Sequence, residues 1–273
     1  MTRLSELGEL GLLAELERRS LVVGVEHDAA QLAGLVLTQD ALVEGVHFTL
    51  DRLSWRDLGW RAAAVNLSDL AASGAEPLGL LVTLALPPDT AAADAVAVYE
   101  GIAETGVPVV GGDTTSSEQV VLSVTAVGRS DRVPGRDGAV PGDTLVVTGP
   151  LGAAGAAFRA GGYVRPPLRI DEGRRLAASA HAMIDISDGL AVDAGHIARR
   201  SGTRVVVELD DVPLAPRATV SDLGFGEDFE LLAAVPDPSG LAAIGRVEEG
   251  EGVVLLHRGA PIALRGFEHF CQR

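Results

Sequence analysis

The chain has 273 residues, 47% hydrophobic and 22% charged, which is long enough for full cores and too apolar for a disordered chain. Its formal net charge of −16 argues against nonspecific binding to nucleic acid or to an anionic membrane. Its single cysteine, Cys271, excludes an internal disulfide framework and a cysteine-based metal cluster.

Residues 1–20 intersperse glutamates among leucines, which predicts a surface helix rather than a secretory signal. No run of about 20 apolar residues occurs, so we expect no membrane span and a cytoplasmic protein. Apolar β-branched runs alternate with alanine-rich stretches, which predicts an α/β fold. We expect strands over residues 21–25, 34–40, 80–86, 107–113, 120–129, 144–149, 182–187, 203–209, 230–235 and 253–257. We expect helices over residues 55–73, 90–105, 153–160, 168–179 and 190–201.

The segment DRVPGRDGAVPGD, residues 131–143, is dense in proline, glycine and aspartate and is typical of a turn-rich connection. We place a domain boundary within it. The sequence therefore predicts an N-terminal domain over residues 1–138 and a C-terminal domain over residues 139–273.

Several aspartates stand where an apolar run ends beside small residues, and ligands in α/β folds collect at the carboxyl ends of strands. One such acid alone is also explained as a helix cap, and Ser187 or Asp188 could cap the helix expected from Leu190. Asp69 instead lies near the carboxyl end of a predicted helix, where the macrodipole disfavours an anion. The acids at strand ends are Asp28, Asp40, Asp113, Asp185 and Asp188.

Convergence of these carboxylates would force some of them to protonate unless a divalent cation neutralised them. Oxygen ligands without a cysteine cluster favour Mg²⁺ over Zn²⁺, and Mg²⁺ held by carboxylates usually also binds phosphate oxygens. The stretch VVGGDTTSS fits a polyphosphate site, because Gly111 and Gly112 allow close approach of a ligand, although a plain turn explains it equally well. The chain has neither a G-x-x-x-x-G-K-[ST] P-loop nor the glycine-rich loop of protein kinases.

Together the motifs resemble the thiamine-monophosphate kinase family, a branch of the superfamily that includes aminoimidazole ribonucleotide synthetase. The pairing of D-x-LVEGVHF with NLSD is highly specific, and the resemblance runs in order through nearly the whole chain. The resembling stretches are HDAA (27–30), TQDALVEGVHF (38–48), AVNLSDLAASGAEP (64–77), VGGDTT (110–115), PGDTLVVTG (141–149), RPPLRI (165–170), MIDISDGL (183–190) and GEDFELL (226–232).

This resemblance implies ATP-dependent phosphorylation of thiamine phosphate to thiamine diphosphate by direct in-line transfer, with several Mg²⁺ ions and no covalent nucleophile. It also implies the two-domain aminoimidazole ribonucleotide synthetase-like fold. In that fold the N-terminal sheet pairs with its copy in a homodimer, and a C-terminal α/β domain closes the active-site cleft.

The resemblance assigns site residues by position. The metal ligands fall on Asp28, Thr38, Asp40, Asp69, Asp113, Asp185 and Asp188. The ATP contacts fall on Gly112, Asp113, Arg136, Ser187 and Tyr99, and the contacts to thiamine phosphate fall on His47, Glu227 and Phe267. We further expect Asp185 and Asp188 to face the cleft and to bind different Mg²⁺ ions.

The chain departs from the family pattern at three places. His27 replaces the first acid of the usual GDDAA, Gln39 replaces Thr or Ser, and Phe225 replaces a glycine of the usual SGGED. Two alternative functions stay open: a superfamily enzyme that acts on another phosphate or an amide oxygen, and a non-catalytic nucleotide- or metal-binding regulator.

Overall fold

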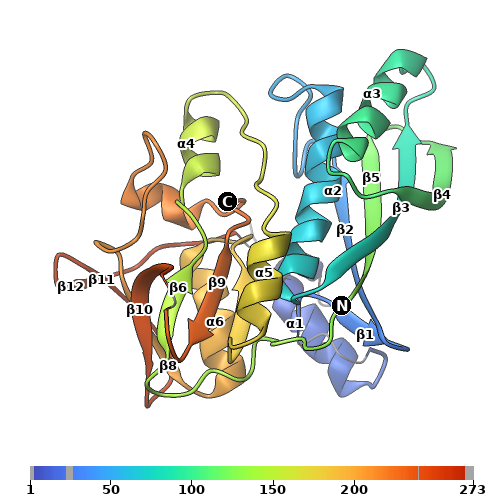
Figure 1. Ribbon diagram of the computed structural model, residues 1–273. Helices are drawn as coiled ribbons and strands as arrows, with labels where there is room; N and C mark the ends of the chain where they lie inside the picture. The colour runs from blue at the N-terminus through green and yellow to red at the C-terminus, as the bar shows by residue number, and fades with distance from the viewer. Residues whose placement is uncertain (1–2, 23–26, 239, 268–273) are drawn as a thin grey trace.

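The computed structural model describes residues 3–22, 27–238 and 240–267, which fold around two β-sheets set side by side with helices between and around them (Figure 1). The α/β class predicted from the sequence is confirmed. The chain passes from the first sheet to the second through residues 130–143, and the predicted boundary lies within this connection.

The N-terminal sheet has five strands in the order β1-β2-β5-β3-β4, antiparallel except for the parallel pair β3–β4. Alternation along the strands divides the sheet into two faces. Leu42, Leu122 and Leu84 lie side by side on a buried face, whereas Thr83 and Asp113 pair on the opposite, exposed face. The strands are β1 (Ala30–Leu32), β2 (Leu35–Val43), β3 (Glu76–Leu86), β4 (Val109–Ser116) and β5 (Val121–Arg129).

Helices α2 (Trp55–Ala72) and α3 (Ala92–Ala103) cover the buried face of this sheet, and α1 (Leu4–Arg18) precedes it. Ser54 caps α2 by accepting the backbone N–H of Asp57 at 3.1 Å. Glycine makes the close packing of α2 on α3 possible, because a Cβ at Gly59 would lie 1.9 Å from the carbonyl oxygen of Val98. The alanine-rich helices can therefore lie deep against the sheet and against each other.

The C-terminal sheet has seven strands in the order β12-β11-β8-β10-β6-β9-β7. Its strands are β6 (Thr144–Val147), β7 (Ala182–Asp185), β8 (Arg204–Glu208), β9 (Leu231–Val235), β10 (Ala242–Glu248), β11 (Gly252–His257) and β12 (Ala260–Ile262). The helices of this half are α4 (Ala153–Arg159), α5 (Ile170–Ala177), α6 (Leu190–Ser201) and the 3-10 turn Val220–Gly224.

Helix α2 also forms the contact between the two halves, and it lies beside α5 in the middle of the molecule (Figure 1). Ala71 and Ala72 at its end join a buried cluster with Met183 and Leu231 of the second sheet. A Cβ at Gly173 of α5 would lie 2.1 Å from the carbonyl oxygen of Ala71, so the two helices touch through their backbones. One helix is thus part of both cores.

All five predicted helices form, each within a few residues of its predicted bounds, and the segment 1–20 contains α1. The strand expected over residues 21–25 falls mostly on residues 23–26, which lie outside the described part of the chain, and residues 21–22 form no strand. The sequence did not predict the short edge strands β1 and β12 or strand β10. No helix within the described ranges has the length and apolar character needed to cross a membrane.

Candidate active site

Three buried or half-buried carboxylates from distant parts of the sequence meet where the two halves touch. Asp28, Asp69 and Asp185 each place a carboxylate oxygen within 4.8 Å of the other two. Asp28 precedes β1, Asp69 lies near the carboxyl end of α2, and Asp185 ends β7. The sequence predicted all three as metal ligands, and the fold brings them together.

The protein environment disfavours ionisation of this group. Burial, followed by the charges of Asp185, Asp40 and Asp28, raises the pKa of Asp69 well above its usual range. Burial and the charge of Asp28 raise the pKa of Asp185 to about 8, although a hydrogen bond from a serine opposes this shift. The pKa of Asp40 is also raised, first because the surrounding protein removes water from its carboxylate and then because of the charge of Asp28. The acids therefore cannot all be ionised at neutral pH without a compensating cation.

Asp40 belongs to the same side of the sheet as this group. Its strand β2 points Val36, Thr38 and Leu42 into the buried face, and Asp40 shares their alternation. Unlike those buried neighbours, Asp40 is exposed to solvent. The acid group is therefore accessible from outside the protein beside Asp40.

Three polar side chains from the α2 motif NLSD hold the acids in place. Asn66 and Asp69 project towards β2 and Ser68 projects towards β7, all from nearly one turn of the helix. The Asn66 Oδ1 accepts the backbone N–H of Asp40 at 3.0 Å, the Ser68 hydroxyl donates to Asp185 at 2.6 Å, and the Thr38 hydroxyl donates to Asp69. The macrodipole conflict at Asp69 is thus offset partly by a hydrogen bond to its ionised form.

Arg136 supplies a positive charge at the edge of the acid group. Its guanidinium donates to Asp28 Oδ1, with an Nε–O distance of 3.2 Å, and the Asp28 side chain is only 3% exposed. His27 Nδ1 accepts the backbone N–H of Arg136 at 3.2 Å. The segment that connects the two domains therefore places Arg136 against the acid group.

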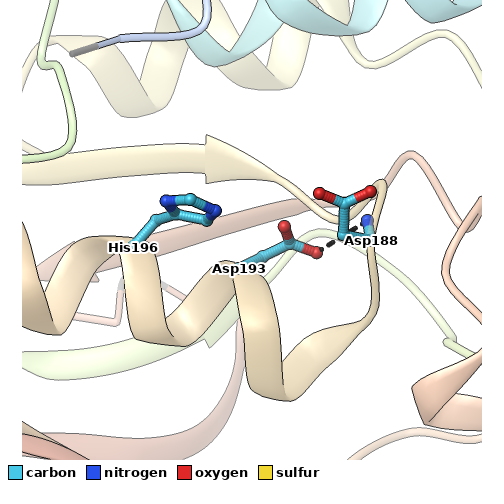
Figure 2. Close-up of side chains that lie close together, drawn as sticks. All are labelled: Asp188, Asp193 and His196. Carbon is cyan, nitrogen blue, oxygen red and sulfur yellow. Dashed lines mark hydrogen bonds between the residues drawn. The ribbon is translucent and has the colours of Figure 1, made fainter. Parts of the chain in front are cut away.

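A second group of possible ligands lies after β7, in the loop before α6 and in the first turns of that helix. Asp188, Asp193 and His196 place ligand atoms within 4.8 Å of one another, and Figure 2 shows Asp193 and His196 on one side of α6 with Asp188 in the loop before it. Burial, followed by the charge of Arg136, lowers the pKa of His196 to about 4, so its ring is neutral at pH 7. A neutral imidazole and two carboxylates are suitable metal ligands.

Asp193 also answers the question of what caps α6. The helix begins after Gly189, which has no side chain, so the capping interpretation of Ser187 and Asp188 is wrong. Instead Asp193 reaches back, and its Oδ2 accepts the backbone N–H of Asp188 at 3.1 Å (Figure 2). The same oxygen accepts the backbone N–H of Gly189 at 3.0 Å. The residue that satisfies the helix start therefore also fixes the loop that carries Asp188.

Two residues predicted to contact thiamine phosphate lie against this loop. The backbone N–H of Glu227 donates to the carbonyl oxygen of Ser187 at 2.8 Å, and the backbone N–H of Phe267 donates to that of Asp188 at 2.9 Å. The third, His47, lies in the loop after β2, where its Nδ1 accepts the backbone N–H of Val43 at 3.0 Å. Glu227 and Phe267 are therefore near the acids of the C-terminal half.

Three predicted residues lie elsewhere. Gly112 and Asp113 are on β4, three strands from β2, which at roughly 4.8 Å per strand is about 14 Å across the sheet. Asp113 also points to the exposed face, away from the acid group. Tyr99 lines a shallow pocket with Val107 and Val109 at the same edge. Within one chain these three residues do not join Asp28, Asp69 and Asp185.

Models of the AIR synthase related protein N-terminal and C-terminal domains match residues 26–130 and 140–258. The chain is 34% identical to the thiamine-monophosphate kinase of Aquifex aeolicus, over 98% of this chain and 100% of that protein. The thiamine-monophosphate kinase of Mycobacterium tuberculosis is 35% identical, over 98% of this chain and 93% of its own length. The chain belongs to the thiamine-monophosphate kinase family.

A solved structure of this family has the same fold. The structure of AaThiL complexed with AMPPCP and TMP superposes with a TM-score of 0.89 at 33% identity, covering 98% of this chain and 99% of that one. The thiamine-monophosphate kinase of Stenotrophomonas maltophilia superposes with a TM-score of 0.73 at 32% identity, covering 93% and 98%. The two-domain fold implied by the sequence motifs is thereby confirmed.

The departures from the family motifs have local structural roles. His27 binds the backbone of Arg136, as described above. Gln39 lies on the exposed sheet face, where its Oε1 accepts the hydroxyl of Thr125 at 3.0 Å. Phe225 packs on Phe158 of α4 with a ring-centroid distance of 5.0 Å. None of the three replaces an acid of the two ligand groups.

Sequence reasoning did not single out several residues that shape the site. Asn66 and Ser68 stand inside the NLSD motif, so the motif itself was a usable signal. Arg61, Asp193 and His196 lie on helices without a distinctive local pattern, and their roles depend on what packs against those helices.

Proposed function

We propose that this protein transfers the γ-phosphoryl group of ATP to thiamine phosphate, giving thiamine diphosphate and ADP. In this reaction a phosphate oxygen of thiamine phosphate bonds to the γ-phosphorus while the bond to the β-phosphate oxygen breaks, without a phosphoenzyme. The observation that carries the proposal is the convergence of Asp28, Asp69 and Asp185 at the junction of the domains. Membership of the family and the close superposition on AaThiL support the same reaction.

The donor set fits Mg²⁺. The two ligand groups offer carboxylate oxygens and one imidazole, and burial raises the pKa of several of the acids, so a divalent cation would restore their ionised forms. We assign Asp28, Thr38, Asp40, Asp69, Asp185 and Asp188 of one chain, together with Asp113 of a second copy, to Mg²⁺ binding. Mg²⁺ bound there would neutralise charge on the phosphate oxygens of both substrates.

The chain's own residues divide the remaining work. Arg136 and Ser187 lie beside the acids, where we propose that they bind ATP, and Arg136 offsets its phosphate charge. His47, Glu227 and Phe267 would hold thiamine phosphate so that its phosphate points towards the same acids. Because phosphoryl transfer depends mainly on positioning and electrostatics, no covalent nucleophile is needed.

We further propose that the protein works as a homodimer. Among the residues that the structure describes, helices cover only one face of the N-terminal sheet, and its other face exposes Leu81, which is 42% exposed, and Thr83. Pairing of this face with a second copy would cover it. It would also explain how Asp113, Gly112 and Tyr99 can serve a site that they do not reach within their own chain. A cytoplasmic location fits an enzyme that consumes ATP.

The decisive experiment measures ADP release with Mg²⁺ and ATP across thiamine phosphate, thiamine and other small phosphates, and identifies the product. We expect turnover with thiamine phosphate and formation of thiamine diphosphate. Turnover only with another phosphate or an amide would favour a different superfamily enzyme. Binding of ATP without turnover of any acceptor, despite ample Mg²⁺, would favour a non-catalytic regulator.

A variant tests the metal assignment that the geometry supports least directly. Asp113→Asn removes one charge from a residue on the exposed sheet face. We expect it to lower kcat by about 100-fold or more, as is usual when one preorganised electrostatic group is lost. Full activity in this variant would remove Asp113 from the metal site.

A further inference from the structure

A buried arginine on α2 reaches across the domain junction to a predicted substrate residue. The side chain of Arg61 is only 6% exposed, and its Nη2 donates to Glu227 Oε1. Arg61 belongs to the N-terminal half, whereas Glu227 stands in the loop before β9 of the C-terminal half. Because burying an arginine is costly unless it is paired, this contact is a specific feature of the junction.

The backbone around Glu227 is already fixed. Glu227 itself adopts a left-handed conformation with φ of +58°, and its N–H donates to the Ser187 carbonyl at 2.8 Å. Gly226 has φ of +80°, and a Cβ there would lie 2.2 Å from the same carbonyl oxygen. The loop is thus pressed against the strand end that carries the acids. The side-chain torsion angles of Glu227 are therefore its main remaining freedom, and the ion pair with Arg61 restricts them.

The same face of α2 also holds an acid of the metal group. Ser68 follows Arg61 by seven residues, or two helical turns, so the two side chains share one face about 10 Å apart along the axis. The Ser68 hydroxyl donates to Asp185 at 2.6 Å. One rigid helix therefore fixes the separation between Glu227, on the acceptor side, and Asp185, on the metal side.

Hydrogen bonding around Arg61 is incomplete. The Arg61 Nε and the Tyr163 hydroxyl are buried and have no hydrogen-bond partner among the described residues. Burial raises the pKa of Tyr163, and the charges of Arg61 and Glu227 both act on it, so the three side chains are neighbours. A buried donor without an acceptor is destabilising. This region is therefore suited to receive a ligand with hydrogen-bond acceptors.

We propose that Arg61 is a positioning residue for the acceptor substrate, which acts by orienting the Glu227 carboxylate towards thiamine phosphate. The proposal rests on the proposed function, in which Glu227 contacts that substrate. Thiamine phosphate carries a positive thiazolium ring, so a carboxylate held in one direction by a guanidinium is a suitable partner. Arg61 on α2 then sets Glu227 in register with the acids that Ser68 and Asp69 hold further along the same helix.

Steady-state kinetics of Arg61→Met and Arg61→Lys test this role. We expect Arg61→Met to raise KM for thiamine phosphate by about 10- to 100-fold, because misplacement of a binding group by about 1 Å has effects of this size. KM for ATP should change by less than about twofold, because Arg136 and Ser187 are untouched. Arg61→Lys should recover part of the loss, since it keeps the charge but not the planar fork.

A matched control removes another ion pair between the two halves. Arg174 of α5 lies 3.4 Å from Glu76 of β3, and both side chains are about half exposed. Arg174→Met should leave both KM values unchanged, since exposed pairs contribute little. If Arg61→Met raised KM for ATP and thiamine phosphate equally, Arg61 would only join the domains and the proposal would be overturned.

A double-mutant cycle with Glu227→Gln asks whether Arg61 acts through Glu227. Glu227→Gln alone should reproduce the KM effect of Arg61→Met, and the double variant should be no worse than either single variant. Additive effects would contradict a shared action. If Arg61→Met does not fold, Arg61→Lys against Glu227→Gln gives the same comparison. Failure of the wild-type protein to phosphorylate thiamine phosphate would instead contradict the proposed function, before any variant is compared.

Discussion

At the scale of one residue, ionisation of Asp185 lowers the stability of the folded protein. The folded protein raises the pKa of Asp185 from an ordinary 3.8 to about 8. Between these values the folded state keeps a proton that the unfolded chain has released. The free energy of unfolding of the metal-free protein should therefore fall as pH rises from about 4 to 8, by at most about 1.4 kcal/mol per pH unit from this group.

Urea unfolding of the metal-free protein at pH 6 and pH 8 measures this effect. We expect a lower free energy of unfolding at pH 8, and a smaller difference in Asp185→Asn, whose side chain does not titrate. Mg²⁺ at millimolar concentration should stabilise the wild-type protein more at pH 8, since it binds the ionised carboxylates. A wild-type protein as sensitive to pH as Asp185→Asn would show that Asp185 ionises normally.

Asp193 makes a separate prediction about metal affinity. Asp193→Ala removes the acceptor of the Asp188 and Gly189 N–H groups, so the loop that carries Asp188 loses its support. We expect the Mg²⁺ concentration for half-maximal activity to rise by about 10- to 100-fold, as for other residues that orient metal ligands. Asp193→Asn is the control, because its amide oxygen can accept the same bonds. Equal effects of the two variants would point to the lost charge rather than to the loop.

The sequence identified the acids of the site better than the residues that orient them. Asp28, Asp69 and Asp185 each stand in a short contiguous motif, which can be recognised in the sequence without knowledge of the fold. Arg61 and Asp193 look like ordinary helix residues, and their importance arises only from contacts with segments more than 100 residues away or from a loop that folds back on the helix. Such contacts are products of tertiary packing and leave no local pattern.

At the scale of the element, β4 depends on one of its two central glycines more than on the other. Gly112 has φ of +149°, and a Cβ there would lie 1.9 Å from the carbonyl oxygen of Val82 on β3. At Gly111 a Cβ would meet only the tip of the Leu81 side chain, at 3.1 Å. The sequence pattern GGD predicted that both glycines allow close approach of a ligand. The packing shows that Gly112 is required by the strand pair itself.

Alanine substitution separates the two glycines. We expect Gly112→Ala to lower the free energy of unfolding by more than about 2 kcal/mol, because the backbone of β3 or β4 must shift. Gly111→Ala should cost less than about 1 kcal/mol, because a flexible side chain can move aside. Urea unfolding of both variants measures the difference. Similar losses in both would contradict the close β3–β4 approach at Gly112.

Secondary structure followed the sequence wherever an element buries a continuous apolar face. Helices α2 and α6 begin at the predicted residues, Trp55 and Leu190. Ser54 caps α2, whereas α6 begins after Gly189, whose backbone N–H donates to Asp193. Strand β1 is exposed along its whole length, and β10 carries Gly245 and charged residues, so neither has an apolar run that predicts a strand. These strands exist because a neighbouring strand offers hydrogen bonds, which the local sequence does not record.

At the scale of the whole molecule, the family motifs predict more site residues than one chain brings together. Asp113 lies about 14 Å across the N-terminal sheet from β2 and on its exposed face, whereas Asp69 of the acid group comes from α2, which covers the other face. Either Asp113 has no part in the site, or it serves the site of a second copy. Leu81→Glu, which places a charge on the exposed face, should shift a dimer to the 28.1 kDa monomer in sedimentation experiments.

Heterodimers of two inactive variants distinguish these possibilities. If Asp113 of one copy completes the site of the other, a heterodimer of Asp113→Asn and Asp185→Asn has one intact site of two. Purified through two different affinity tags, it should show about half of the wild-type activity. A heterodimer of Asp28→Asn and Asp185→Asn is the control and should stay inactive, because both acids belong to the group within one chain. No recovery in the first pair would mean that Asp113 does not act across a dimer interface.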